Sequence, residues 1–282
     1  MKKVIVVTDS SATIPRELLQ ELDIRVVPLL LNFEGHTYQD GVDITPDEFY
    51  QRLRNSQNLA TTSTPSVGDF VRVYAQAGRE SSGIVSIHLP VNLSGVYLTA
   101  LKASELVDGP QIQVMDSRTV SMAQGFAVMA AARKAASGAS LEEVVAHAKE
   151  IVQRVRIYVM LETLEYLHRG GRIGDAASLL GSILQIKPLL YVLDGQVKPL
   201  AKPRTRERGM QIMLKEMEKE VNHQPIHAAI VQADAREEAE HFKQLVAERF
   251  DCLELYITEF TPVMGAHSGP GILGVAFYLE GD

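Results

Sequence analysis

The chain has 282 residues, of which 46% are hydrophobic and 22% charged, a composition typical of a soluble globular protein with one large domain or two smaller ones. Its formal net charge is −7, with 28 Lys and Arg against 35 Asp and Glu. Nucleic-acid recognition normally needs a basic excess on at least one face, so this balance argues against a nucleic-acid binder.

The cysteine content and the N-terminal residues indicate the cellular compartment to expect. Cys252 is the single cysteine, so it has no partner for a disulfide or for a cysteine-based metal site, and a reducing compartment is expected. The apolar run from Val4 to Val7 is shorter than a signal-peptide core or a membrane span. We therefore expect a cytoplasmic protein without a transmembrane segment.

In the first half, short runs rich in Val and Ile alternate with segments of helical spacing. The strand-like runs cover residues 4–7, 26–31, 84–89, 112–115 and 157–161. Residues 11–15 predict the start of a first helix, and Thr45-Pro46 gives the same signal before a second. This alternation predicts a parallel sheet with crossover helices.

The second half has a different sequence pattern. A Gly-rich turn at residues 170–174 precedes apolar residues spaced for an amphipathic helix over 176–184. Asp194-Gly195 predicts a hairpin turn between strands 189–193 and 196–200. A long Met-lined helix over 210–221 and strands near 228–231, 253–257 and 275–279 follow. We predict two closely packed domains, 1–159 and 160–282.

We interpret four short patches of small hydroxylated residues as lying just after apolar, strand-like runs. They cover residues 8–13, 61–66, 92–95 and 267–271. In α/β proteins the loops at strand ends converge, and Ser and Thr hydroxyls, Gly-exposed N–H groups and a His can all hydrogen-bond an oxyanion. The patches therefore predict one site for a small anion without a metal, and they favour binding over bond cleavage.

The second and third patches hold more hydroxyls than helix capping needs. Residues 61–66 contain five hydroxyls in six positions, whereas one N-cap requires one. Ser66 or Thr64 could cap the following helix, and Thr62 or Ser63 could face a ligand. Residues 92–95 show the same excess, and Gly95 would let a bound group approach the backbone.

Two groups of basic residues allow two interpretations each. Arg169 and Arg172 flank Gly170-Gly171, where an Arg could fork onto a carboxylate or simply lie on a surface loop. A second group precedes the Met-lined helix and is either a solvated face or a docking site for an acidic partner. Its members are Lys198, Lys202, Arg204, Arg206 and Arg208.

Enzyme motifs give little support for catalysis. The nucleophile elbow, the HExxH zinc motif and the P-loop are absent. Residues 269–274 fit G-x-G-x-x-G, but they precede a strand-like run instead of opening a helix. Asp9, Ser94 and His267 could converge as a triad, although helix capping and loop contacts are the favoured explanation of these residues. An esterase using Ser94 or Ser63 with His267, and a small-anion binder, remain alternatives.

Together these motifs resemble the DegV family of bacterial fatty acid-binding proteins, some of which are the acyl-carrying subunits of fatty acid kinase. The resemblance covers essentially the whole chain. The motifs that carry it are Thr8-Asp9-Ser10-Ser11-Ala12, Thr62-Ser63-Thr64-Pro65-Ser66, Leu93-Ser94-Gly95 with Tyr97, Met115-Asp116-Ser117 with Val120-Ser121, Arg169-Gly170-Gly171-Arg172-Ile173-Gly174, Ile186-Lys187-Pro188 and Gly265-Ala266-His267-Ser268-Gly269-Pro270-Gly271.

The resemblance implies an α/β fold in which an N-terminal parallel-sheet α/β/α domain joins a C-terminal two-layer α/β domain with a mixed sheet. A ligand tunnel would lie between them and hold a long-chain fatty acid. The resemblance assigns the carboxylate to Thr62, Ser94 and His267, with Arg172 near the head group and Ser63 and Gly95 beside the main contacts.

The same resemblance implies a lipid-binding subunit without a catalytic residue, metal or cofactor of its own. Its partner would be a separate fatty acid kinase catalytic subunit. That subunit would phosphorylate the bound carboxylate, and the acyl phosphate would feed phospholipid synthesis.

Overall fold

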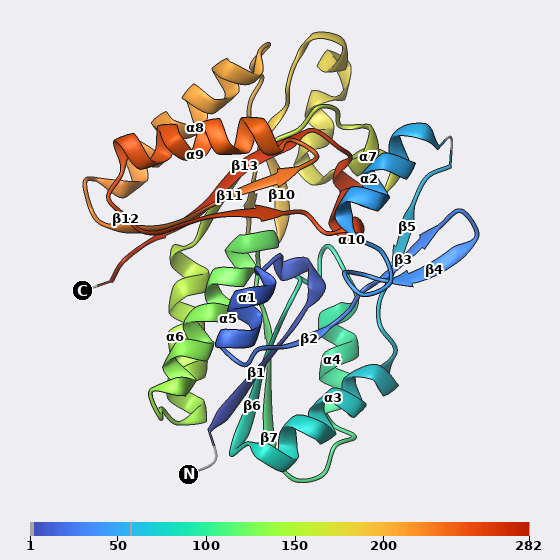
Figure 1. Ribbon diagram of the computed structural model, residues 1–282, viewed down its shortest axis with the longest axis vertical. Helices are drawn as coiled ribbons and strands as arrows, with labels where there is room; N and C mark the ends of the chain where they lie inside the picture. The colour runs from blue at the N-terminus through green and yellow to red at the C-terminus, as the bar shows by residue number, and fades with distance from the viewer. Residues whose placement is uncertain (1–2, 57, 282) are drawn as a thin grey trace.

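The chain folds around three sheets (Figure 1). A computed structural model describes residues 3–56 and 58–281, including their side chains except those of 181–185. The first sheet has four parallel strands in the order β2-β1-β6-β7, which are β1 (Val4–Asp9), β2 (Arg25–Val27), β6 (Gly83–His88) and β7 (Gln111–Asp116). The parallel sheet expected from the alternating sequence is therefore confirmed.

Helices cover both faces of this sheet, as crossover connections between parallel strands require. One side has α3 (Val67–Glu80) and α4 (Val96–Ser104), and the other has α5 (Ser121–Ala136) and α6 (Leu141–Arg154) (Figure 1). The Ala-rich α5 is buried along most of its length and also contacts the second large sheet. The short η1 (Ser10–Ala12) and α1 (Arg16–Glu21) follow β1.

The second large sheet is mixed and has six strands in the order β10-β9-β8-β13-β11-β12. These are β8 (Arg156–Met160), β9 (Leu189–Leu193), β10 (Gln196–Ala201), β11 (Ile226–Ala233), β12 (Cys252–Glu259) and β13 (Ile272–Leu279). Helices α8 (Arg206–Val221) and α9 (Arg236–Arg249) cover its outer face. The predicted hairpin is confirmed, because Asp194 (φ 51°) and Gly195 (φ 73°) are both left-handed between β9 and β10.

Alternating side chains of β8 face opposite ways, and this alternation joins the two halves. Tyr158 and Met160 pack in the core beneath α8 and α9, whereas Ile157 and Val159 pack in the core shared with the N-terminal half. The six-stranded sheet is thus covered on one face by its own helices and on the other by the first half of the chain.

A small three-stranded antiparallel sheet, in the order β4-β3-β5, lies beside the boundary of the two halves. It consists of β3 (Leu30–Phe33), β4 (His36–Gln39) and β5 (Thr61–Ser63). Helix α2 (Pro46–Asn55) connects β4 to β5, and α10 (Pro262–Ser268), from the far end of the chain, contacts α2, β3 and β5. Helix α7 (Glu165–Arg169) also contacts α10.

Three expectations about elements were wrong. The run 26–31 is not one strand but the ends of β2 and β3, because Pro28 lacks an N–H and interrupts the ladder. The run 157–161 contributes β8 to the mixed sheet, antiparallel to β13 and β9, and not to the parallel sheet. Residues 174–185 form a 3₁₀ helix, η2 (Gly174–Gln185), instead of an α-helix.

The sequence pattern cannot separate these two helix types here. Ala176 and Leu179 are buried and three residues apart, a spacing that periods of 3.0 and 3.6 residues satisfy equally over one turn. Predicted core positions Ile183 and Leu184 have side chains outside the described part of the chain.

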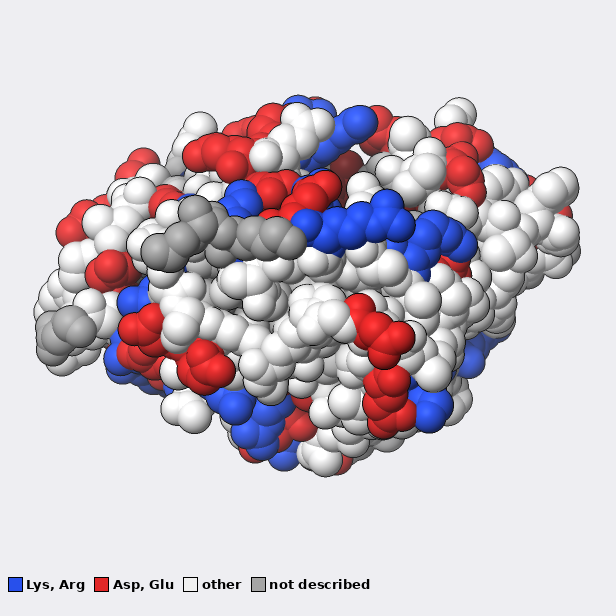
Figure 2. Space-filling view, turned by 90° about the horizontal axis from the view of Figure 1, so that it is seen from below, with Lys and Arg blue, Asp and Glu red and all other residues white. Residues whose placement is uncertain are grey.

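The face that carries the N-terminus has basic and acidic side chains interspersed over a largely uncharged surface (Figure 2). Near that terminus, Lys3 pairs with Asp23 at 3.0 Å, and Arg25 pairs with Asp23 at 3.0 Å and Glu80 at 3.3 Å. Such exposed pairs are a solvated surface and contribute little to stability. None of the described helices is long and apolar enough to span a membrane.

Candidate functional site

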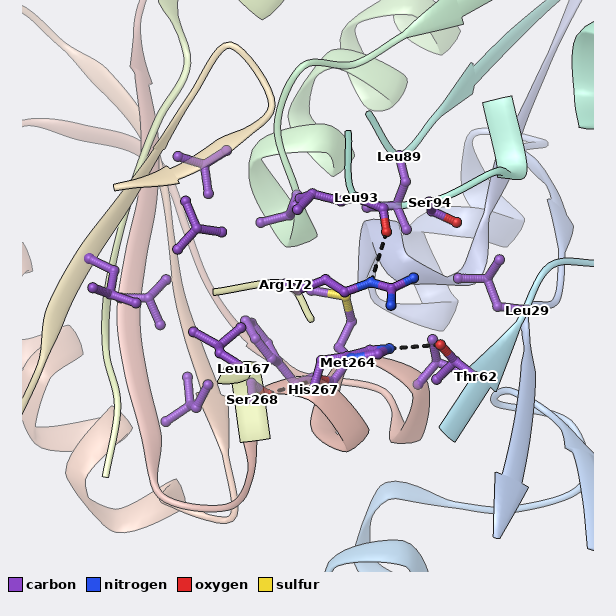
Figure 3. Close-up of a pocket in the computed structure, with 18 of the residues that line it drawn as sticks. Leu29, Thr62, Leu89, Leu93, Ser94, Leu167, Arg172, Met264, His267 and Ser268 are labelled. Atoms are coloured by element: carbon purple, nitrogen blue, oxygen red, sulfur yellow. Dashed lines mark hydrogen bonds between the residues drawn. The ribbon is translucent and has the colours of Figure 1, made fainter. Parts of the chain in front are cut away.

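A cavity of about 170 Å³ lies where the six-stranded sheet meets the first half of the chain (Figure 3). Its polar lining comes from three of the four predicted patches and from the Gly-rich turn, and consists of Thr62, Ser63, Thr64, Ser94, Gly95, Arg172, His267 and Ser268. The six residues that the family resemblance assigns to the ligand site, Thr62, Ser63, Ser94, Gly95, Arg172 and His267, therefore all line one cavity. Among the described lining residues the only charged one is Arg172, so the cavity is biased toward an anion.

The first contact in the cavity joins two distant parts of the chain. Thr62 lies in β5, and its Oγ1 is 2.7 Å from Nε2 of His267, in the last turn of α10 (Figure 3). Ser66 takes the capping role instead, since its hydroxyl accepts from Asp69 N at 3.2 Å at the start of α3. The hydroxyl-rich segment thus supplies both the N-cap of α3, through Ser66, and a cavity contact, through Thr62.

His267 is neutral near pH 7. Burial lowers its pKa to about 4, with a smaller contribution from the positive charge of Arg172. Its Nδ1 is buried and has no hydrogen-bond partner within the described residues. A Cβ on Gly170 would lie 2.4 Å from this atom, so a Gly Cα–H faces Nδ1. A lone pair tolerates that neighbour better than an N–H does, which favours the tautomer with its proton on Nε2.

This tautomer has a consequence for Thr62. The Nε2–H of His267 donates to Thr62 Oγ1, and the hydroxyl hydrogen of Thr62 is then free to donate elsewhere. A carboxylate in the cavity is an acceptor of the right kind, because carboxylates accept hydrogen bonds and donate none. The pair therefore offers a directed donor to an anion.

Arg172 is held by the backbone on two sides. Its Nε donates to Leu93 O at 3.1 Å, and Nη1 donates to Gly170 O at 2.7 Å. These bonds orient the guanidinium beside Ser94 while part of its donor set remains unused (Figure 3). Arg169, its predicted counterpart, instead pairs with Glu165 on the surface at 2.7 Å and lies outside the cavity lining.

Ser94 and Gly95 lie in the loop between β6 and α4. The Ser94 hydroxyl accepts from Val96 N at 3.3 Å, which leaves its O–H free to donate. A Cβ on Gly95 would meet only Thr64 Cγ2, at 3.6 Å, an ordinary contact. The loop that carries Ser94 therefore lies close to Thr64, which directly follows β5, at the cavity.

The remainder of the lining is apolar and was not predicted residue by residue. It comes from β8, β9, β10, β13, α7, α10 and the loops, and consists of Leu29, Leu89, Leu93, Val120, Val159, Leu161, Leu167, Leu190, Tyr191, Val192, Val197, Phe260, Val263, Met264 and Ile272. Figure 3 shows aliphatic side chains on the side of the sheet and the polar groups of Thr62 and Ser94 on the other side. Strands β8, β9 and β13 are apolar on both faces, so no signal in their sequences marks which residues face the cavity.

The first predicted patch, residues 8–13, does not line the cavity. Its Asp9 is fully buried and accepts from His88 Nδ1 at 2.9 Å, Leu89 N at 3.1 Å and Ser11 N at 3.1 Å. Burial alone would raise the pKa of Asp9, but the hydrogen bond and electrostatic interaction with His88 and the hydrogen bond from Ser11 hold it below its ordinary value. The patch is a structural network that aligns the ends of β1 and β6.

The same network excludes the proposed triad of Asp9, Ser94 and His267. Asp9 engages His88, whereas His267 engages Thr62. Asp9, His88 and Ser86 do form a chain, with Ser86 Oγ 2.6 Å from His88 Nε2, but all three are 0% exposed and Tyr74 donates to Ser86 Oγ. A buried serine that accepts such a bond has no access to a substrate.

The other motifs have structural explanations. The G-x-G-x-x-G run follows α10 and leads into β13, as expected, so it opens no helix. Within the described residues, no three His, Cys, Asp or Glu side chains are grouped to hold a metal ion. Arg206 has a structural role and is not part of an open basic surface, because it pairs with Glu238 and donates to Gly271 O at 2.8 Å.

Sequence and structure comparisons agree with this geometry. A family model described as "Uncharacterised protein, DegV family" matches residues 3–280. The chain belongs to the DegV family. It is 32% identical to Protein DegV of Bacillus subtilis (strain 168) over 279 residues, which cover 98% of this chain and 99% of that protein.

Solved DegV structures have the same α/β fold of two domains. A DegV family protein from Thermus thermophilus, described with fatty acid binding, is 32% identical with a TM-score of 0.94 and covers 99% of this chain and 100% of that chain. DegV of Bacillus subtilis, described as a fatty acid binding protein, is 31% identical with a TM-score of 0.91 and the same coverage. A stearic acid-binding protein from Eubacterium ventriosum is 27% identical, with a TM-score of 0.90, and covers 99% of this chain and 98% of that chain.

Proposed function

We propose that this protein binds a long-chain fatty acid in the cavity. The observation that carries the proposal is a single cavity with hydroxyl, imidazole and guanidinium groups on one side and aliphatic side chains on the other. Related DegV proteins described with fatty acid ligands support it. In this proposal residues 1–159 supply the head-group loops, and residues 160–282 complete the site with Arg172, His267 and the apolar wall.

The tail would provide most of the affinity. Burying about fifteen methylenes at about 0.8 kcal/mol each gives roughly 12 kcal/mol of gross driving force, which ordering costs then reduce. The carboxylate would accept from Thr62, Ser94 and Arg172, with His267 orienting the Thr62 hydroxyl. These donors would limit the desolvation cost of the carboxylate and fix its position, and Ser63 and Gly95 would border it.

The experiment that tests binding is native mass spectrometry of freshly purified protein, followed by organic extraction and identification of the bound molecule. A mass excess that matches a long-chain fatty acid is expected. A ligand-free mass that persists after incubation with free fatty acids would contradict the proposal. A polar anion in the extract would instead favour the small-anion alternative.

We further propose that the protein has no catalytic site of its own and presents the fatty acid to a separate kinase subunit, which forms an acyl phosphate for phospholipid synthesis. A cytoplasmic site of action belongs to this proposal, and the absence of a disulfide partner for Cys252 is consistent with it. The esterase alternative is disfavoured because His267 uses Nε2 to contact Thr62 and has no acidic partner on Nδ1 within the described residues. Ester turnover by the isolated chain would revive it.

The basic group just before α8 and in its first turn is the candidate docking surface for that kinase, and three of its members are exposed. These are Lys202, Arg204 and Arg208, because Arg206 is engaged by Glu238 and Lys198 lies 3.5 Å from Asp175. The double reversal Arg204→Glu/Arg208→Glu should weaken acyl phosphate formation while fatty acid binding is retained. A matched double reversal further along α8, Lys215→Glu/Lys219→Glu, should leave both acyl phosphate formation and fatty acid binding intact. Equal kinase activity in the two variants would refute this docking surface.

A further inference from the structure

Helix α10 carries His267 and is attached to the first half of the chain at its opening turn. The side chain of Asp40, just after β4, accepts from Val263 N at 3.0 Å, across 223 positions of sequence. Asp40 is only 2% exposed. Because Val263 is the second residue of α10, this bond satisfies one of the N–H groups that a helix leaves free at its start.

The same small sheet also holds the other end of α10. Strand β3 lies between β4 and β5, and Leu31 pairs with Tyr38 on one side and Thr62 on the other. Asp40 N continues the ladder by donating to Leu29 O at 2.9 Å. The sheet thus fixes the spacing between Asp40, which binds the first turn of α10, and Thr62, which binds His267 in the last turn.

We propose that Asp40 is a positioning residue of the carboxylate site: by anchoring the first turn of α10, it places His267 within hydrogen-bond distance of Thr62. The role of Asp40 in carboxylate binding rests on the proposed function. The anchoring of α10 and the placement of His267 do not depend on it. Val263 and His267 are only four positions apart, or roughly 6 Å along the helix, so a displaced first turn displaces the imidazole as well.

A buried carboxylate loses favourable hydration, so the buried position of Asp40 needs a compensating contact such as the bond from Val263 N. Its Oδ2 and the neighbouring Thr261 Oγ1 have no hydrogen-bond partner within the described residues. Burial is the largest influence on Asp40 and raises its pKa.

A second attachment of α10 comes from Tyr50, whose hydroxyl donates to Phe260 O at 3.1 Å just before the helix begins. The contribution of Asp40 therefore has to be separated experimentally from the other contacts that hold α10 in place.

Three variants separate these roles. Asp40→Ala removes the acceptor, whereas Asp40→Asn keeps an oxygen that can accept from Val263 N and removes the charge. Asp43→Ala is the matched control, because Asp43 is exposed, accepts from Gln39 N at 2.8 Å in the same turn and makes no hydrogen bond to α10. Affinities are measured for palmitic acid and for hexadecanol, which has the same tail without the carboxylate.

Asp40→Ala should lower the affinity for palmitic acid about tenfold, the equivalent of one misplaced hydrogen bond to a charged group, and change hexadecanol binding about twofold or less. Asp40→Asn and Asp43→Ala should stay close to the wild type. Equal losses for both ligands, or the same loss in Asp43→Ala, would overturn the positioning role. If Asp40→Ala does not fold, Asp40→Ser, whose side chain is too short to reach Val263 N, replaces it with the same expectations.

A ligand-free measurement keeps this inference independent of the proposed function. The imidazole of His267 is titrated by NMR in the wild type and in the Asp40 variants. Loss of the anchor should raise the pKa of His267 from about 4 toward its ordinary value, because the ring leaves its buried position. An unchanged His267 titration in Asp40→Ala would contradict the inference, whereas a wild type that binds neither ligand would contradict only the proposed function.

Discussion

The hydroxyl of Thr62 lies 2.7 Å from Nε2 of His267, although 205 positions separate them in the chain. Thr62 belongs to the small sheet of the first half, and His267 ends the helix that precedes the last strand. The contact therefore exists only when both halves are folded and packed together. It makes the head-group site a product of the domain arrangement and not of one loop.

Replacing Thr62 by Val should weaken fatty acid binding while preserving the shape of the side chain. A hydrogen bond to a charged group is worth about 1.5–3 kcal/mol, so the expected loss is roughly 10- to 100-fold in affinity. Isothermal titration calorimetry with palmitic acid measures it. Thr61→Val, at the exposed neighbouring position of β5, is the control and should bind normally. A Thr62→Val protein with wild-type affinity would exclude this hydroxyl from the site.

Replacing Gly170 by Ala should disturb the site without removing any polar group. The new Cβ would lie 2.4 Å from His267 Nδ1 and 3.0 Å from Tyr166 O, so the imidazole has to move. Overpacking of this kind costs about 1–3 kcal/mol, and palmitic acid affinity should fall roughly tenfold. Thermal unfolding and calorimetry on the same samples separate the two effects.

Gly68→Ala provides the matched control for that change. Gly68 is exposed in α3, and its added Cβ would meet only Ser66 Oγ, at 3.6 Å. It should leave both stability and binding close to the wild type. Unimpaired binding by Gly170→Ala would show that the position of His267 is not critical.

Local signals predicted much of the fold. Hydrophobic runs gave β1, β6 and β7, the Asp194-Gly195 turn gave the β9–β10 hairpin, and the Met spacing gave the buried face of α8. Each of these depends on residues that are close in sequence. Pro28 was a readable signal that residues 26–31 are two strands, because proline interrupts a hydrogen-bonded ladder.

The site was only partly predictable for the same reason. Excess hydroxyls marked Thr62 and Ser94, because more of them were present than capping requires. The patch at residues 8–13 carried the same signal, yet it is a buried network around Asp9, since hydroxyl content alone does not separate a ligand contact from a satisfied core group. Asp40 carried no signal, because its partner, Val263 N, is a backbone atom 223 positions away.

The stability of the protein should fall with acid partly through His267. Burial lowers its folded-state pKa to about 4, below the ordinary value of 6.5, so the unfolded chain binds more protons between these values. The stabilisation from a neutral His267 is therefore complete above pH 6.5 and is lost as pH falls toward 4. Urea unfolding of ligand-free wild type and His267→Gln across this range measures it, because Gln does not titrate. The wild type should lose more stability than the variant, and parallel curves would contradict a neutral buried His267.

His227 should show the opposite pH dependence. Its Nδ1 lies 3.1 Å from a Glu254 carboxylate oxygen, its Nε2 contacts Glu280, and its ring stacks on Tyr278 with centroids 4.5 Å apart. Both ring nitrogens can donate only in the imidazolium form. Burial alone would lower the pKa of His227, but the hydrogen bonds and charges of Glu254 and Glu280 raise it above its ordinary value.

The sign follows from a folded-state pKa that lies above the unfolded one. The stabilisation from His227 is fully present below pH 6.5 and is lost as pH rises through the folded-state pKa. The stability difference between wild type and His227→Gln should therefore be largest near pH 6 and shrink in alkaline buffer, as measured by urea unfolding. His147→Gln is the control, because the side chain of His147 is 36% exposed and its one ion pair among the described residues is with Glu150, at 3.6 Å. A difference between wild type and His227→Gln that does not vary with pH would mean that His227 is neutral and keeps only one of its two carboxylate contacts.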